Sequence, residues 1–315
     1  MKLSNWQKAI GAGLLAQTIW GIAGPLVKII LYTVPPFSLL FLRCLFASLV
    51  LFGVYETKWS KKFSFSSIPF QDKKDIFWAG FYGVFLNIAL YFWAQELTTV
   101  SDAWIISSSG TIFVVALSYL FLKERLSRTV YAGIGLAFLG TLVIIGTPLL
   151  KAGTGSLLGN VLMLGATLAA SISTFYTKKV VSKYPPLLLT FFFFLISLIF
   201  ISPFFLWEFT QFPLWISQLT FQSYLIIAYL VAGSSIGAYF LYNKSLVSLS
   251  PSIASTIAYS GAVISIGLSI LFLNERLSIF FIIGTILIIV GLFLAEFRHP
   301  NHPIRKLKKR LAARS

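Results

Sequence analysis

Long apolar stretches alternate with short polar connectors along almost the whole chain. Ten of them approach the length of about 20 residues that an α-helix needs to cross the hydrocarbon core of a membrane. They cover roughly residues 9–29, 37–55, 76–95, 103–122, 130–150, 157–177, 187–207, 222–242, 252–273 and 278–296. The pattern therefore predicts an all-α integral membrane protein with ten transmembrane helices, five in each half of the chain.

The two halves share short motifs at an offset of 150 or 151 residues. Residues 122–127, LKERLS, return as residues 273–278, LNERLS. A Pro-Pro dipeptide, a lysine and two glycines return as well: Pro35-Pro36 as Pro185-Pro186, Lys28 as Lys178, Gly133 as Gly284 and Gly140 as Gly291. Because each half holds an odd number of spans, the second half must enter the membrane from the opposite side. We therefore expect two inverted five-helix repeats, residues 1–150 and 151–297, followed by a basic tail at 298–315.

Composition and charge agree with a membrane location. The chain is 57% hydrophobic and 11% charged, with a mean hydropathy of +0.88, which leaves too little polar surface for a soluble globule. The net charge of +16 is divided among short connectors, so it does not indicate a nucleic-acid partner. Most Lys and Arg lie in the termini and connectors that the span pattern puts on the same side of the membrane as the N-terminus. The positive-inside rule then places both termini in the cytoplasm of a multi-pass protein of the cytoplasmic (inner) membrane, with the basic tail against lipid headgroups.

The residue inventory disfavours an enzyme. The single cysteine, Cys44, lies inside the second span, and both histidines, His299 and His302, lie in the tail. The acids lie at span edges or in connectors, so no nucleophile with a base, paired carboxylates or metal cluster forms within the membrane. We expect no catalytic residues, metal or cofactor. A carboxylate relay for protons is also unsupported, which favours facilitated diffusion or exchange. The longest polar connector, residues 56–75, is predicted to be an interfacial loop.

Polar and aromatic residues inside the spans are the candidate substrate contacts. Arg43 is the only ionisable side chain well inside a span. An Arg near the bilayer centre costs about 2.5–3.5 kcal/mol, so it must face protein, water or a ligand. It contacts either an anionic group of a substrate or the protein itself in a structural role. The other candidates lie on single helix faces: Gln17, Trp20, Asn87, Tyr91, Trp104, Ser108, Ser171, Tyr239, Asn243 and Tyr259. Their groups can orient a zwitterion, or they can join helices by hydrogen bonds.

Charged residues near the ends of spans are the candidate gating residues. They are Lys28, its counterpart Lys178, and the glutamates of the repeated motif, Glu124 and Glu275. Each glutamate precedes an arginine, so ion pairing is the alternative interpretation. The repeated glycines lie seven residues apart and share a helix face, where small residues allow close packing. They predict either packing of helices within the chain or a homodimer contact.

The order of these motifs resembles the EamA-domain type of the drug/metabolite transporter (DMT) superfamily, once in each half. The first half has Trp20-Gly21, Lys28, Pro36 and Arg43, and closes with residues 123–126, KERL. The second half keeps Lys178, Pro186 and residues 275–277, ERL, but has Ala170 in place of Trp and Phe193 in place of Arg. The resemblance implies a secondary carrier of ten spans that moves small metabolites or drugs, often outward, and it does not fix the substrate.

The aromatic residues and the lone Arg43 favour a secondary transporter for an amino acid or a derivative, acting in efflux or exchange by alternating access. Within the same class, a cofactor or nucleotide-type importer, such as one for S-adenosylmethionine, and a multidrug exporter remain open. A channel or a non-transporting membrane subunit is the alternative outside this class. The expected partners are a small-molecule substrate and membrane lipid.

Overall fold

The computed structural model describes residues 4–60, 63, 67–114, 117, 128–146 and 155–297, and this part of the chain is helical without strands. Seven helices in it are long and apolar enough to cross a membrane, and two shorter apolar helices cover Ala132–Gly146 and Ile279–Gly291. The predicted span at 103–122 falls partly outside the described residues. An all-helical membrane protein is therefore confirmed.

The described helices fall into two consecutive halves along the chain. The elements of the first half are α1 (Asn5–Ile30), α2 (Pro36–Lys58), α3 (Phe70–Gly80), η2 (Phe81–Leu86), α4 (Asn87–Leu97), α5 (Val100–Ser108) and α7 (Arg128–Gly146). Those of the second half are α8 (Leu157–Val180), α9 (Pro186–Gln211), η4 (Pro213–Gln218), α10 (Phe221–Tyr229), η5 (Leu230–Ala238), α11 (Tyr239–Ser248), α12 (Pro251–Leu273) and α13 (Ile279–Phe297).

The repeated proline pairs begin equivalent helices. Pro36 is the first residue of α2 and Pro186 is the first residue of α9. Proline suits this position because its fixed φ is helical and its missing N–H would have had no partner there. The repeated Pro-Pro dipeptide therefore marks the start of the equivalent helix in each half.

The third helix of each half contains a π-helical segment at the equivalent position. The segments are η2, between α3 and α4, and η5, between α10 and α11. A π-helix widens the turn and is often found at functional sites. Here the two wide turns place consecutive residues such as Ser234 and Ser235 toward the interior, where both are buried.

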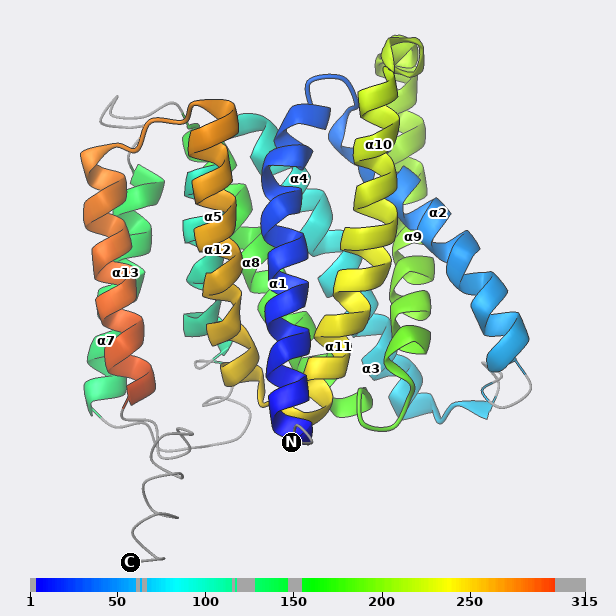
Figure 1. Ribbon diagram of the computed structural model, residues 1–315, viewed down its shortest axis with the longest axis horizontal. Coiled ribbons are helices and arrows are strands. Elements are labelled where there is room, and N and C mark those ends of the chain that lie inside the picture. The colour runs from blue at the N-terminus through cyan, green and yellow to red at the C-terminus, as the bar shows by residue number, and fades with distance from the viewer. Residues whose placement is uncertain are drawn as a thin grey trace, which may run out of the picture.

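Corresponding helices of the two halves run in opposite directions (Figure 1). The end of α1 contacts the end of α4 through Lys28, and α8 begins at that same end, where the Ser156 amide donates to the Leu97 carbonyl. α8 finishes at the other end, where Lys183 pairs with Asp72 of α3. α1 begins and α13 ends at this second end, which we call the termini end; the opposite end is the Lys28 end.

α7 and α13, the fifth helices of the two halves, pack against each other at one side of the bundle (Figure 1). A Cβ on Gly140 would lie 2.6 Å from the Gly284 carbonyl oxygen, and a Cβ on Gly291 would lie 2.6 Å from the Gly133 carbonyl oxygen. Only glycine allows backbones to approach so closely. The repeated glycines therefore support packing within the chain, and a homodimer contact stays a prediction.

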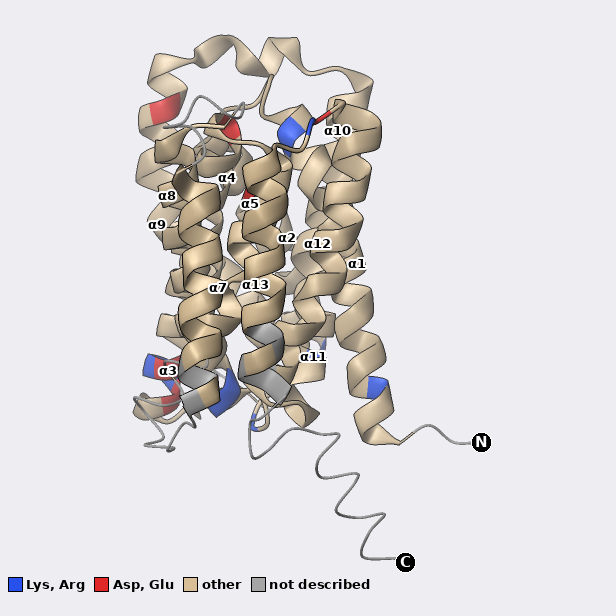
Figure 2. Ribbon diagram, turned by 90° about the vertical axis from the view of Figure 1, so that its left-hand side faces the viewer, with Lys and Arg blue, Asp and Glu red and all other residues tan. Residues whose placement is uncertain are grey.

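Charged side chains gather toward the two ends of the bundle (Figure 2). At the termini end Asp72 of α3 accepts from Lys183 Nζ at 2.7 Å and from Tyr184 Oη at 2.8 Å. Burial, together with the hydrogen bond to Asp72, raises the pKa of Tyr184 to about 12. Helices extend a few residues into both ends of the predicted loop over residues 56–75. α2 continues to Lys58 and α3 starts at Phe70, because Asp72 in the first turn stabilises the helix N-terminus.

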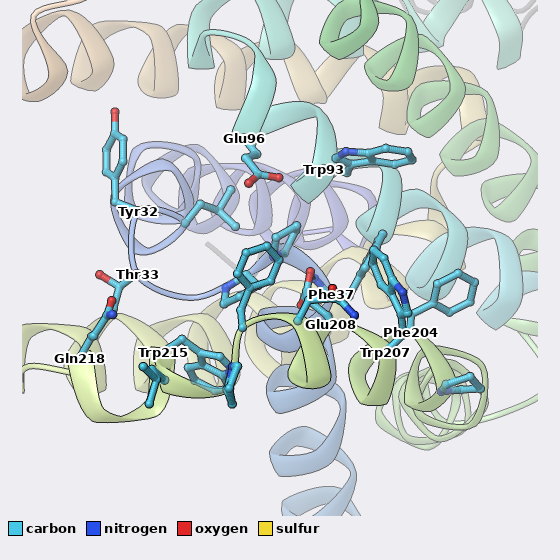
Figure 3. A pocket seen from close by; sticks show the side chains of 18 residues that line it. Tyr32, Thr33, Phe37, Trp93, Glu96, Phe204, Trp207, Glu208, Trp215 and Gln218 are labelled. Carbon is cyan, nitrogen blue, oxygen red and sulfur yellow. Dashed lines mark hydrogen bonds between the residues drawn. The ribbon is translucent and has the colours of Figure 1, made fainter.

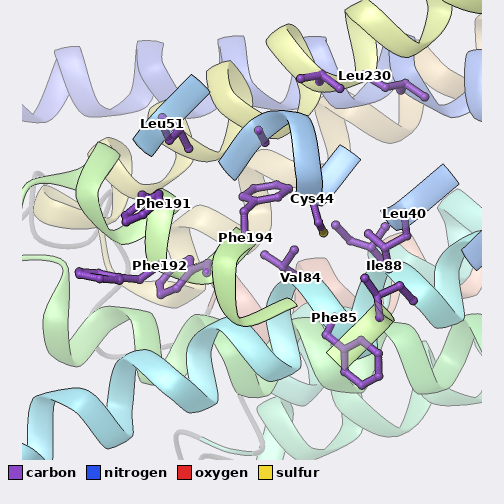
Figure 4. Close-up of a cluster of buried hydrophobic side chains, with 14 of the residues drawn as sticks. Leu40, Cys44, Leu51, Val84, Phe85, Ile88, Phe191, Phe192, Phe194 and Leu230 are labelled. Atoms are coloured by element: carbon purple, nitrogen blue, oxygen red, sulfur yellow. The ribbon is translucent and has the colours of Figure 1, made fainter. Parts of the chain in front are cut away.

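The apolar interior lies mainly between α2, α9 and the two π segments (Figure 4). Leu40, Cys44, Val84, Phe194 and Leu230 are fully buried there. Lipid is as apolar as these side chains, so close packing rather than removal from water holds the helices together.

Candidate functional site

A cavity of about 240 Å³ lies between the two halves, lined by α1, α2, η2, α4, α5, α8, η5, α11 and α12. All predicted substrate contacts except Tyr259 line it: Gln17, Trp20, Arg43, Asn87, Tyr91, Trp104, Ser108, Ser171, Tyr239 and Asn243. Tyr259 lies next to it and contacts the lining residue Thr111, with 2.8 Å between the two hydroxyl oxygens. We call this space the central cavity. The structure brings the predicted set together, and their role as substrate contacts stays a prediction.

Arg43 projects from α2 and is only 3% exposed. Its Nε donates to Ser235 Oγ at 3.0 Å, its Nη2 donates to Ser234 Oγ at 3.1 Å, and its guanidinium lies 5.1 Å from the centre of the Phe92 ring. A guanidinium has five N–H donors. Only two of them have acceptors in the described part of the chain, and Arg43 forms no ion pair there. The remaining donors can bind an anionic oxygen.

The charge that lines the central cavity is positive. Arg43 is the only Lys, Arg, Asp or Glu among the lining residues that the structure describes. Trp104 adds a buried indole N–H that lies beside the Tyr91 hydroxyl and makes no hydrogen bond of standard geometry in the described part of the chain. A buried donor without an acceptor costs about 1–3 kcal/mol, so both residues would gain from an oxygen acceptor on a ligand.

Aromatic side chains form the part of the cavity wall beside Arg43. Trp20 Nε1 donates to the Ser234 carbonyl oxygen at 3.1 Å, and its ring contacts Tyr239 edge-on at 5.2 Å and Tyr242 at 5.5 Å between ring centres. Tyr239 Oη donates to the Gly83 carbonyl oxygen at 2.9 Å, which joins the two π segments. These bonds hold flat apolar faces in place against any ligand in the cavity.

Asn87, Asn243 and Ser171 join separate segments, the last through a 3.2 Å bond to the Gly110 carbonyl oxygen, whereas Tyr91 and Ser108 bond within their own helices. These contacts support the structural alternative. Asn87 donates to the Ala166 carbonyl oxygen at 2.8 Å, and Asn243 donates to Thr190 Oγ1 at 3.1 Å. Tyr91 Oη accepts from Gln95 Nε2 at 2.8 Å. Ser108 and Ser171 donate to backbone carbonyls of their own helices, at 2.8 and 2.9 Å. The amide oxygens and the ring faces remain as the groups that a ligand can use.

The predicted gating residues bind helix ends. Lys28 Nζ donates to the carbonyl oxygens of Gln95 at 2.5 Å and Thr98 at 2.9 Å, after which α4 ends. Lys178 does the same for α11, with Leu246 at 2.5 Å and Leu249 at 2.9 Å, at equivalent positions of the repeat. A cation at a helix C-terminus is favourable because it offsets the unpaired carbonyls. The two lysines therefore secure opposite ends of the bundle.

Glu275 follows α12 and binds the start of α5. Its carboxylate accepts from the amides of Val100 at 2.7 Å and Ser101 at 3.0 Å, and from Ser101 Oγ at 2.6 Å. This contact joins the two halves at the Lys28 end. In this structure Glu275 forms no ion pair with a described residue, so a contact to a helix N-terminus replaces the ion-pair alternative. Its counterpart Glu124 lies outside the described residues.

Sequence reasoning missed two contacts between the halves. Glu208 of α9 accepts from the amides of Phe37 and Ser38, at 3.2 and 2.6 Å, and so caps α2. No repeat signal marks Glu208. The pairing of Asp72 and Asp75 with Lys183 and Lys179 could have been anticipated, because the span pattern puts both connectors on the same side of the membrane.

Comparisons with known proteins agree with this architecture. The EamA-like transporter family matches residues 7–146 and again 157–297. An uncharacterized transporter of Archaeoglobus fulgidus is 31% identical over 181 residues, covering 56% of this chain and 59% of that protein. The uncharacterized transporter YetK of Bacillus subtilis is 25% identical over 300 residues, covering 93% of this chain and 88% of its own length. A second A. fulgidus transporter is 28% identical over 288 residues.

A solved crystal structure shares the fold, with a TM-score of 0.62 and 17% identity over 93% of this chain and 98% of the other. The two family matches coincide with the two halves identified from the repeated motifs, and the relatives are named as transporters rather than enzymes. The predicted resemblance is thus confirmed, and the chain belongs to the EamA-like transporter family.

Proposed function

We propose that this protein is a secondary transporter that carries a small organic carboxylate, an amino acid or a derivative of one, through the central cavity. The supporting observation is Arg43. It is buried, retains unused N–H donors, and faces a cavity whose lining has no Asp or Glu. A carboxylate matches the planar donor fork of a guanidinium, and such bonds are stronger than neutral ones.

The same charge pattern ranks the alternatives. S-Adenosylmethionine carries a carboxylate that Arg43 can bind, but its additional sulfonium charge, like the charge of a cationic drug, would meet no carboxylate among the described lining residues. The ammonium of an amino acid is easier to accommodate in the cavity. Amide oxygens and hydroxyls can accept its hydrogen bonds, and the faces of Trp20 and Tyr239 can contact its charge. A channel is disfavoured because the relatives are named as transporters.

The transport cycle that we propose uses ten spans in two inverted repeats, in the cytoplasmic membrane with both termini inside. Antiparallel α1 and α8, and the equivalent contacts of Lys28 and Lys178, support a pseudo-two-fold relation between the halves. Alternating access then follows from breaking one set of end contacts while the other holds. Efflux or exchange fits better than proton coupling, because the central cavity offers no Asp or Glu for protonation. A homodimer stays a prediction.

Transport by purified protein in proteoliposomes tests the proposal. The panel contains radiolabelled proteinogenic L-amino acids, their N-acetyl derivatives, nucleosides and organic cations. We expect saturable exchange of at least one carboxylate-bearing compound, with loss of that exchange in Arg43→Gln. The control is Arg276→Gln, which removes an exposed arginine outside the cavity and should transport normally. Flux only of cations or nucleosides, or unitary currents in planar bilayers, would refute the proposal.

A further inference from the structure

A second and larger cavity, of about 1040 Å³, opens at the Lys28 end of the bundle (Figure 3). It lies between the α1–α2 connection, the end of α4, the end of α9 and η4. No residue lines both this space and the central cavity. We call it the outer cavity, and its argument is independent of the proposed transport reaction.

The outer cavity carries the opposite charge from the central one. Glu96 and Glu208 line it, and its described lining residues include no Lys or Arg. Glu208 is 3% exposed, and its oxygens accept three hydrogen bonds from Phe37 and Ser38. The Glu96 carboxylate has no hydrogen-bond or ion-pair partner in the described part of the chain. The nearby cation, Lys28, is held by backbone carbonyls of α4 and does not line the cavity.

Seven aromatic residues contribute to the remaining wall. Trp93, Trp207 and Trp215 face the cavity, together with Tyr32 and Phe37. Trp93 and Trp207 are exposed, at 38% and 58%, as in the aromatic belts of membrane proteins. A belt does not explain Trp215, which is 5% exposed and whose buried indole N–H has no acceptor in the described part of the chain. Such a donor indicates an oxygen that a ligand would bring.

We propose that the outer cavity binds an organic ammonium cation that carries an oxygen acceptor close to its charge. Trp faces attract ammonium groups, and Glu96 and Glu208 add negative charge beside them. Trp215 donates to the oxygen. The choline group has this chemistry, either as the free alcohol or as the phosphate-linked headgroup of phosphatidylcholine. Binding there leaves the central cavity free for its own ligand.

Saturation-transfer difference NMR tests this proposal with free choline and protein in phosphatidylglycerol nanodiscs. The matched neutral compound is 3,3-dimethylbutan-1-ol, which replaces the ammonium nitrogen by carbon. We expect a protein-dependent signal for choline and a signal reduced at least about two-fold for the neutral compound. Trp207→Ala should weaken choline binding by about 2- to 30-fold, the range expected for cation–π contacts. Glu96→Gln should also weaken it, because the variant loses the carboxylate charge.

Two controls match these variants at the termini end. Glu56→Gln removes an exposed carboxylate and Trp6→Ala removes an exposed indole, and neither should change choline binding. Repeating the NMR experiment in phosphatidylcholine nanodiscs shows whether the natural occupant is a lipid headgroup or a free cation. A weaker choline signal there identifies the lipid headgroup as the occupant, and an unchanged signal identifies a free cation.

Three results would overturn the proposal. The first is no choline signal in phosphatidylglycerol nanodiscs, and the second is equal binding of the neutral compound. The third is choline binding that survives Glu96→Gln and Trp207→Ala but disappears in Trp20→Ala, which would place the cation in the central cavity. Failure of this test leaves Arg43-dependent transport unaffected, so the two proposals fail separately.

Discussion

The crossing of α1 and α12 beside the central cavity gives a prediction whose size follows from the structure. A Cβ on Gly261 would lie 2.9 Å from the Gln17 carbonyl oxygen and 3.0 Å from the Trp104 ring. Both neighbours line the cavity, and the carbonyl cannot move without shifting α1. Gly267 is on the same helix six residues later, and a Cβ there would have nothing within 4 Å.

Gly261→Ala and Gly267→Ala therefore form a matched pair. Each exchange gains about 1 kcal/mol from the higher helix propensity of Ala, so this gain cancels in the comparison. The remaining difference is the cost of overpacking at Gly261, about 1–3 kcal/mol. We expect Gly267→Ala to be as stable as the wild type or more so, and Gly261→Ala to be less stable than Gly267→Ala by that amount.

Reversible unfolding in mixed SDS micelles measures the free energy of unfolding of both variants. The same proteins in proteoliposomes report transport, which should fall in Gly261→Ala because Gln17 and Trp104 are displaced, and stay unchanged in Gly267→Ala. Equal stability of the two variants, or loss of transport in Gly267→Ala alone, would refute the packing that we describe.

Two further predictions concern contacts at the ends of the bundle. Tyr184→Phe removes a hydrogen-bond donor from buried Asp72 and should destabilise the protein by about 1–3 kcal/mol. Lys183→Ala removes a largely exposed ion-pair partner of Asp72 and should cost less than about 1 kcal/mol. Unfolding of both variants in SDS tests this order, and a reversed order would contradict it. Glu275→Gln removes the charge that holds the start of α5, so the Lys28 end should open more often. A cysteine placed at position 101 should then react faster with an impermeant maleimide than the same cysteine with Glu275 intact. Equal rates would contradict a gating role for Glu275.

Much of the fold could be predicted because the bilayer constrains the sequence strongly. The length of the apolar stretches predicted the helices, and the repeated Pro36 and Pro186 marked equivalent helix starts. The limits of the 56–75 connector were predicted a few residues too wide because charged residues such as Asp72 look like loop residues, although they also stabilise the first turn of a helix. The π segments η2 and η5 carry no sequence signal that apolar periodicity can detect.

The candidate site was predictable as a set of inward faces but not as a network. The spacing of Trp20, Asn87 and Tyr91 identified residues that line the central cavity. Their partners, such as Ser234 for Trp20 and Arg43, are about 190 to 215 positions away in the chain, so only the packed helices reveal them. Glu208 lacks a repeat counterpart, and its contact with α2 depends wholly on tertiary structure.

The central claim is that Arg43 binds the carboxylate of the transported molecule. The most direct test is equilibrium binding of a transported amino acid and of its own amide to the wild type, Arg43→Gln and Arg43→Lys, with thermal unfolding to show that each variant is folded. Charge-assisted hydrogen bonds contribute about 1.5–3 kcal/mol, so Arg43→Gln should weaken binding of the carboxylate by about 10- to 150-fold. Binding of the amide should change little, and Arg43→Lys should recover part of the loss because it keeps the charge without the planar fork. Equal weakening of the acid and the amide in folded Arg43→Gln would contradict the claim and leave Arg43 as a structural residue.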